Sequence, residues 1–133
     1  MRVKARLNRL KRYEQTKAIV RKELIKIVTF GLNNVRNTAI SGIKQGIKTG
    51  TVRKDGSIRS AEGEFPATDT GFLASNIFVK RSYTGLSGEV ISKANYSAFL
   101  EFGTSKMGAR PFMQPSLEEN RPKIRARARR VFK

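Results

Sequence analysis

The side chains that most often perform catalysis or bind metals are scarce in this sequence of 133 residues. Histidine and cysteine are both absent, so the chain lacks the commonest general base, the usual zinc ligands and a thiol nucleophile. Three carboxylates, Glu62, Glu64 and Asp69, lie close enough in sequence to bind a divalent cation. No base or nucleophile pattern accompanies them, and acidic clusters are commonly solvated loop. We therefore predict that the protein is not an enzyme and has no catalytic residue, metal site or cofactor.

Positive charge, in contrast, is abundant. The chain has 28 Lys and Arg against 10 Asp and Glu, a formal net charge of +18, which predicts an acidic partner. Residues 1–60 carry 16 basic and 3 acidic side chains, residues 61–120 carry 5 and 7, and residues 121–133 carry 7 and none. This distribution indicates a nearly neutral core with two cationic arms. Repulsion among so many like charges favours an oligomer or complex over an isolated monomer.

The length predicts one domain, 1–133, because domains typically have roughly 100 to 200 residues. No apolar run approaches the roughly 18 residues that a membrane span requires. The basic N-terminus leads into a periodic segment and lacks the apolar core of a signal peptide. We expect a protein of a cytosol-like compartment, or of an assembly built there.

The first arm is predicted to be a long helix. Apolar residues return at helical spacing from Leu7 to Ile43, which predicts a basic N-terminal helix over 1–46. Such a helix would be about 60 Å long, so it either projects from the domain or breaks. The candidate weak points are Gly31, Gly42 and Gly46, and we place an end near Gly46.

Residues 47–68 have the glycine-rich composition of a loop, which we expect to be flexible in the isolated protein. Within this loop, the sequence Lys54-Asp55-Gly56-Ser57 predicts a tight turn between two short strands, 51–53 and 58–60.

Residues 69–119 are predicted to form the α+β core. Asp69 or Thr70 is expected to cap a short helix over 71–75. Two β-prone segments, 76–82 and 89–92, flank a turn and predict a hairpin.

Two further helices are predicted after the hairpin. Asn95 is expected to start a short helix that buries Tyr96, Phe99 and Leu100 on one face and ends at Phe102-Gly103. Pro115 suits the first turn of the last helix, which Pro122 either kinks or restarts. Residues 120–133 form the basic C-terminal arm, a helix or a tail. The fold class is thus α+β: a long N-terminal helix packed on a small antiparallel β-sheet, with a short motif helix and a basic C-terminal helix or tail.

Two segments of the core resemble a known family. The run NYSAFLEFGTSKM at 95–107, followed by ARPFM at 109–113 and by Pro115, is similar to the signature of the gene-product-ten-like morphogenesis proteins of long-tailed phages. The upstream run DTGFL at 69–73, with Ile77 after it, resembles another segment of the same family. The resemblance covers about residues 66–119. Three residues depart from the family pattern: Ala74, Asn76 and Ser116 replace the usual Arg, Ser and Ala. The contacts that the family's arginine makes are therefore not expected of residue 74.

The resemblance implies a structural virion protein of the phage neck, assembled in the host cytoplasm. It would complete the tail and join it to the head as a ring around the DNA channel. The implied partners are further copies of itself, the connector or stopper protein, the tail-tube protein, and genomic DNA passing through the channel. Neither a membrane nor a small-molecule substrate is expected. The motif marks ten residues for folding or assembly: Tyr96, Phe99, Glu101, Phe102, Gly103, Thr104, Arg110, Pro111, Phe112 and Pro115.

The motif also has a physical interpretation. Glu101 would lie at the C-terminal end of a helix, where a carboxylate is unfavourable unless a cation pairs with it, and Arg110 is the expected partner. Gly103 supplies a positive φ, Pro111 stiffens the returning chain, and Phe112 anchors it in the core. We rank this fold-maintaining role ahead of a purely intersubunit one, and the same loop can serve both.

The alternative function is a histone-like or architectural DNA-binding protein. The high net charge and cationic arms are typical of phosphate binding, and Arg125, Arg127, Arg129 and Arg130 are candidate contacts for either DNA or an acidic protein surface. The sequence lacks a zinc-ligand set and an aromatic-rich ribonucleoprotein segment. Its one GxxG, at 85–88, is better explained as a hairpin turn.

Overall fold

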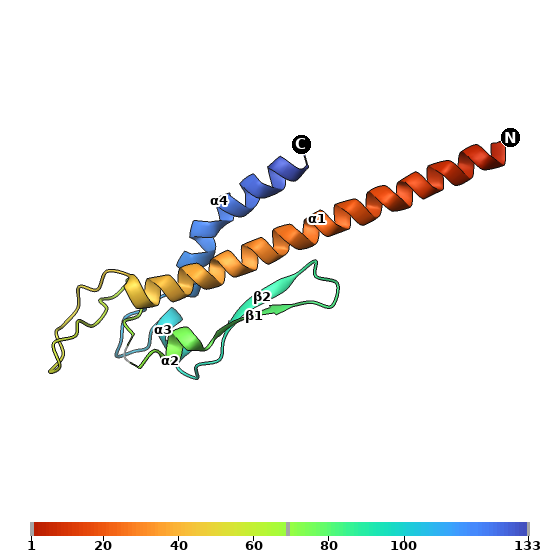
Figure 1. Ribbon diagram of the computed structural model, residues 1–133. Coiled ribbons are helices and arrows are strands. Elements are labelled where there is room, and N and C mark those ends of the chain that lie inside the picture. Colours follow the sequence, from red (N-terminus) through yellow and green to blue (C-terminus); the bar gives the residue numbers. More distant parts are fainter. Residues whose placement is uncertain (1, 69, 133) are drawn as a thin grey trace.

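The computed structural model describes residues 2–68 and 70–132, with side chains from residue 6 onward. The chain folds into helices α1 (Arg2–Gln45), α2 (Phe72–Ser75), α3 (Ser97–Phe102) and α4 (Met113–Val131), and strands β1 (Ile77–Arg81) and β2 (Gly88–Ser92). Figure 1 shows α1 as a rod, with the hairpin along one side and α4 along another. The predicted α+β class is confirmed.

Helix α1 projects and does not break. Its 44 residues correspond to about 66 Å of helix. Of the three suspected weak points, Gly46 directly follows the last residue of α1, as predicted. The other two, Gly31 and Gly42, are sites where neighbours approach closely. A Cβ atom at Gly31 would lie 2.9 Å from Ile124 Cδ1, and one at Gly42 would lie 2.3 Å from Phe65 Cδ1. Both glycines therefore serve packing, which outweighs their lower helix propensity.

The C-terminus of α1 is held by a lysine. Lys48 Nζ donates hydrogen bonds to the carbonyl oxygens of Gly42, at 2.9 Å, and Phe65, at 2.7 Å. A cation at this end is favourable because the last carbonyl groups of a helix lack partners within the helix. Partial burial lowers the pKa of Lys48, against the opposing effect of the Glu64 charge.

Strands β1 and β2 form the predicted antiparallel hairpin, in a register that runs from Ile77 opposite Ser92 to Arg81 opposite Gly88. Two hydrogen bonds tie this hairpin to α1. Arg36 Nε donates to the carbonyl oxygen of Ile77 at 3.0 Å, and Arg81 Nη1 donates to Thr29 Oγ1 at 3.2 Å. A two-stranded sheet is only marginally stable by itself, so this packing is needed to hold it.

The buried core is small and lies where the C-terminal half of α1 meets α2, the hairpin and the segment entering α4. Its members are Ala39, Ile43, Leu73, Ala74, Ile77, Ala94 and Phe112.

Helix α4 packs antiparallel to α1. Buried Asn120 donates through Nδ2 to Thr38 Oγ1 and to the carbonyl oxygen of Ser116, both at 2.8 Å, and Ile124 covers Gly31 further along. Both donor positions of the amide thus have partners. A shift of the two helices along each other would leave this buried polar group without them, which is costly, so the hydrogen bonds fix how the helices align. The C-terminal arm, predicted as a helix or a tail, is a helix that continues through Pro122.

Two predictions about the short helices are wrong. Gly71, at φ 78°, precedes α2 without a side-chain cap, so Thr70 does not cap it; Asp69 lies outside the described residues. Helix α3 starts at Ser97 and not Asn95, and no residue within it is buried. Of the three residues predicted to share a buried face, Leu100 packs against the core, whereas Tyr96 and Phe99 are exposed. Phe112 enters from the following segment and occupies the interior.

The loop over 47–68 contains the predicted turn, although the two short strands reduce to a single bridge between Val52 and Ile58. Glu64 closes the base of this loop. Its carboxylate accepts hydrogen bonds from the Thr49 hydroxyl, from the Thr49 amide at 3.0 Å and from the Ala61 amide at 2.8 Å. These donors, the Thr49 hydroxyl foremost, lower the pKa of Glu64. Flexibility of the loop remains a prediction.

Candidate assembly site

Glu101, at the end of α3, caps the next helix. Its Oε2 accepts hydrogen bonds from the amides of Phe112, at 2.9 Å, and Met113, at 3.0 Å, and Oε1 accepts one from the amide of Gln114 at 2.9 Å. Three otherwise unsatisfied N–H groups at the start of α4 thereby gain a charged acceptor. The carboxylate is unfavourable against the dipole of α3 but favourable against that of α4.

The predicted pair between Glu101 and Arg110 is therefore wrong. Arg110 reaches across to the 47–68 loop, where Nε donates to the carbonyl oxygen of Ser60 at 3.1 Å. Its Nη1 donates to the carbonyl oxygen of Gly108, in its own turn, at 3.0 Å. The carboxylate has three aligned amides in reach, so it needs no cation. Arg110 instead connects the motif to residue 60, fifty positions earlier in the chain.

The turn between α3 and α4 has the backbone geometry that the motif predicts. Gly103 has φ 75°, and a Cβ atom there would lie 2.9 Å from the amide nitrogen of Ala109. Thr104 pairs with Met107 in a bridge, with its amide donating to the Met107 carbonyl oxygen at 2.8 Å. A side chain at position 103 would therefore be disfavoured by conformation and by contact.

Phe112 is the anchor of this turn, as predicted, and is only 1% exposed. Pro111 precedes it, and Pro115 lies in the first turn of α4, where a missing N–H group is tolerated. Ser116, which replaces the usual Ala of the family, is buried and donates its hydroxyl to the Phe112 carbonyl oxygen. The substitution thus leaves no buried polar atom without a partner.

Both signature segments line one pocket of about 550 Å³. Thr70, Gly71, Phe72 and Leu73 come from the upstream segment, and Tyr96, Leu100, Met107 and Arg110 come from the downstream one. Residues of the 47–68 loop complete the wall: Arg53, Arg59, Ser60, Pro66, Ala67 and Thr68. Residues far apart in sequence thus share one cavity, a grouping that the sequence did not reveal.

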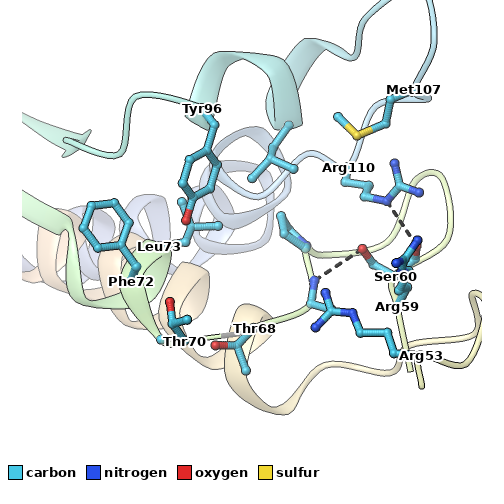
Figure 2. A pocket seen from close by; sticks show the side chains of 14 residues that line it. Arg53, Arg59, Ser60, Thr68, Thr70, Phe72, Leu73, Tyr96, Met107 and Arg110 are labelled. Carbon is cyan, nitrogen blue, oxygen red and sulfur yellow. Dashed lines mark hydrogen bonds between the residues drawn. The ribbon is translucent and has the colours of Figure 1, made fainter. Parts of the chain in front are cut away.

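The pocket has two chemically different ends. Figure 2 shows Phe72 and Tyr96 together at one end, and their ring centroids are 6.2 Å apart. Arg53, Arg59 and Arg110 gather at the other end. The aromatic end suits apolar surface, and guanidinium groups such as that of Arg59 at the other end suit a carboxylate.

The motif also presents aromatic side chains outward. Phe99 is 57% exposed and Phe102 is 82% exposed. Large apolar side chains that cluster on a surface commonly mark protein interfaces. Because α3 buries neither ring in the single chain, these two residues are free for contact with another protein.

The four candidate arginines of the C-terminal arm differ in their surroundings. Arg127 places its guanidinium 4.4 Å from the centre of the Phe30 ring, a cation–π contact with α1. Arg125, Arg129 and Arg130 are exposed on α4. Arg127 is exposed as well, so all four are available to a partner, and Arg127 also contributes to helix packing.

Two of the three acidic residues near the loop, Glu62 and Glu64, are among the residues that the structure describes. Within the described part of the chain, no group of three or more potential ligands is close enough to hold an ion, and Asp69 lies outside that part. Over the same residues, no helix combines the length and apolar character needed to cross a membrane.

Sequence reasoning missed two features of this site. The capping role of Glu101 depends on a turn that brings residue 101 to residues 112–114, and Arg59 joins the pocket only because the loop folds back. The cap could have been predicted from the sequence, because one short turn separates Glu101 from the start of a helix that contains Pro115. No local signal marked Arg59.

Comparison with known proteins confirms the family resemblance. The model of the HK97-gp10-like family, described as a tail component of the bacteriophage HK97 gp10 type, matches residues 3–103, which include all of α1 beyond its first residue, the hairpin and α3. No curated protein and no solved structure gives a significant match to the chain.

Proposed function

Since the chain belongs to the HK97-gp10-like family and is thus a structural component of the phage tail, we propose that it acts in the neck of the virion. It completes the tail and joins it to the head, as a ring of identical subunits around the channel through which DNA passes. Its neighbours in this proposal are the connector or stopper protein and the tail-tube protein.

The observation that carries this proposal is the exposed motif helix. Phe99 and Phe102 belong to the segment that resembles the family, and both rings face solvent in the single chain. Residues needed only for folding would be buried, as Phe112 is. Exposed aromatics in a shared motif are expected to be covered by the next subunit or by a neighbouring neck protein.

The charge distribution supports the same arrangement. Residues 61–120 carry 5 basic and 7 acidic side chains, so copies meeting through this core avoid strong mutual repulsion. The basic segments at either end of the chain stay available for acidic neighbours or for DNA. Isolated subunits at moderate salt are expected to associate weakly and to form the ring on their neighbours.

The test replaces Phe99 and Phe102 together by serine. Both rings are exposed, so the thermal stability of the variant should stay close to that of the wild type. Phages carrying the variant should accumulate unjoined heads and tails, counted by electron microscopy. Tyr83→Ser is the matched control, because Tyr83 is a fully exposed aromatic at the hairpin turn, outside the motif.

Normal virions from the Phe99 and Phe102 variant, with the protein incorporated at its usual level, would refute the role of the motif helix in joining. Equal damage by Tyr83→Ser would show that any exposed aromatic matters, and would remove the support that the motif gives.

A further inference from the structure

The N-terminal half of α1 lacks a packing partner among the described residues. Every side chain from residue 6 to residue 22 is exposed. In Figure 1 this half, coloured red, extends past all other elements. Helices in water gain most of their stability from packing an apolar face, so a free helix of this length calls for a surface that covers it.

An apolar stripe runs along this free half. Leu10, Tyr13, Val20 and Leu24 are all exposed, and with Lys17 between them they follow alternating spacings of three and four residues. The same spacing continues at Ile27, which is buried. This 3–4 repeat places the residues on one helix face, in the narrow seam that pairs helices in coiled coils.

The stripe continues a face that is already used for helix packing. Position 31, the next in the repeat, is the glycine covered by Ile124 of α4. Helix α4 ends at Val131 while α1 runs on. The stripe also leads into an apolar groove of about 360 Å³ between α1, β2 and α4, whose lining includes Ile27, Val28, Leu32, Val90, Leu117 and Ile124.

The charges beside the stripe select its partner. Residues 6–22 carry seven basic side chains and one acidic side chain, Glu14. A second copy of this arm would bring like charges together, which is unfavourable. Duplex DNA would neutralise the charges but offers a phosphate backbone, with no matching apolar seam. A membrane surface would draw Lys17, at the centre of the stripe, toward the acyl chains.

We infer that residues 6–24 of α1 form a docking surface for an acidic amphipathic helix of another protein. The partner helix lies along the stripe with its own 3–4 apolar repeat, and its carboxylates pair with flanking cations such as Arg9 and Arg21. This inference rests on the exposed helix and its charges, so it stands apart from the neck assignment.

The experiment measures binding of the full-length chain to four probes at physiological salt. The first is a synthetic helical peptide with leucine at 3–4 spacing and glutamate elsewhere. The others are poly-glutamate of equal charge, a short DNA duplex, and vesicles that contain phosphatidylserine. The amphipathic peptide should bind at least about tenfold more tightly than poly-glutamate, because only the peptide buries the stripe.

The decisive variant is Leu10→Gln with Tyr13→Gln, which should weaken peptide binding by about tenfold or more while poly-glutamate binding stays unchanged. Ile19→Gln is the matched control and should change binding little, since Ile19 is 63% exposed but lies off the stripe. Circular dichroism checks that each variant keeps its helix.

Equal affinity for the peptide and poly-glutamate, or equal effects of the two variants, would overturn the inference. Loss of DNA or vesicle binding in the stripe variant, without loss of peptide binding, would also overturn it.

Discussion

A single carboxylate links the two helices of the motif. Glu101 ends α3 and caps α4 through three backbone amides, each at 2.9 to 3.0 Å. Hydrogen bonds from amides to an ionised acceptor are stronger than neutral ones. The turn around Gly103 is thus held at its base by a side chain and at its end by the buried ring of Phe112.

We predict that Glu101→Ala lowers the stability of the protein by about 0.5 to 2 kcal/mol, the usual cost of losing an N-terminal cap. The substitution leaves the first amides of α4 without their acceptor, so the start of α4 should fray before the rest of the chain unfolds. Thermal denaturation and amide exchange at residues 112–114 measure the two effects.

Glu119→Ala is the matched control for this cap. Glu119 lies on the exposed face of α4 and pairs with Lys123, at 3.7 Å, in a surface ion pair worth about 0 to 1 kcal/mol. If the two substitutions lowered the melting temperature equally and left exchange at residues 112–114 unchanged, Glu101 would not act as a cap.

At the scale of single residues, the sequence predicts features that depend on the local backbone. Gly103 adopts the expected positive φ and Phe112 is buried, since turn geometry and hydrophobicity act over a few residues. The partner of Glu101 was predicted wrongly. An ion pair and a helix cap compete for one carboxylate, and which of them wins depends on where the turn places the first amides of α4.

At the scale of elements, periodicity predicts α1 and the hairpin well. The apolar spacing of α1 and the turn residues between β1 and β2 are local signals. The contact of Arg110 with Ser60 joins segments fifty residues apart, so no local pattern announces it. For the same reason, the pocket formed by the two signature segments and the 47–68 loop could not be predicted.

The 47–68 loop should respond to acid through Glu64. Its hydrogen bonds from Thr49 and Ala61 lower its pKa in the folded protein below the ordinary value. A carboxyl group with a lowered folded pKa stabilises the fold above its unfolded pKa, and this contribution is lost as the pH falls through the folded value. We predict that amide protection at Thr49 and Ala61 decreases as the pH falls below the ordinary pKa of a glutamate side chain.

Amide exchange measured between neutral and acidic pH checks this prediction. Glu64→Gln should show weakened protection already at neutral pH, and its protection should change less with acid. Glu62→Gln is the control, since the Glu62 carboxylate accepts none of these hydrogen bonds. Protection at Thr49 and Ala61 that does not depend on pH in the wild type would contradict the role of Glu64.

At the scale of the whole molecule, the protein is a small packed core from which two basic helices extend (Figure 1). The projecting half of α1 combines positive charge with an apolar stripe, whereas the end of α4 presents arginines with little large apolar surface before Val131. The two helices therefore suit different contacts. The end of α4 carries charge that suits two functions, binding to DNA and binding to acidic protein surfaces.

Replacing Arg125, Arg129 and Arg130 by serine separates these two functions. Arg127 is left in place because it packs on Phe30. If α4 served mainly to bind DNA, wild-type affinity would fall steeply with salt, with a log–log slope of about −0.9 per phosphate contact, and the variant would lose several of these contacts. The control removes equal charge elsewhere, outside the signature segments, at exposed Lys44, Lys54 and Lys80.

We expect instead that the wild type binds duplex DNA only weakly at physiological salt, and that both triple variants reduce this binding to a similar extent. Sequence-independent attraction to phosphates depends on total charge, so the position of the lost charges should matter little. Head-to-tail joining, scored by electron microscopy, should fail only in the α4 variant, because acidic surfaces of neighbouring proteins require arginines at defined positions. Tight DNA binding that only the α4 substitutions abolish, together with normal joining by that variant, would instead make DNA binding the function of this helix.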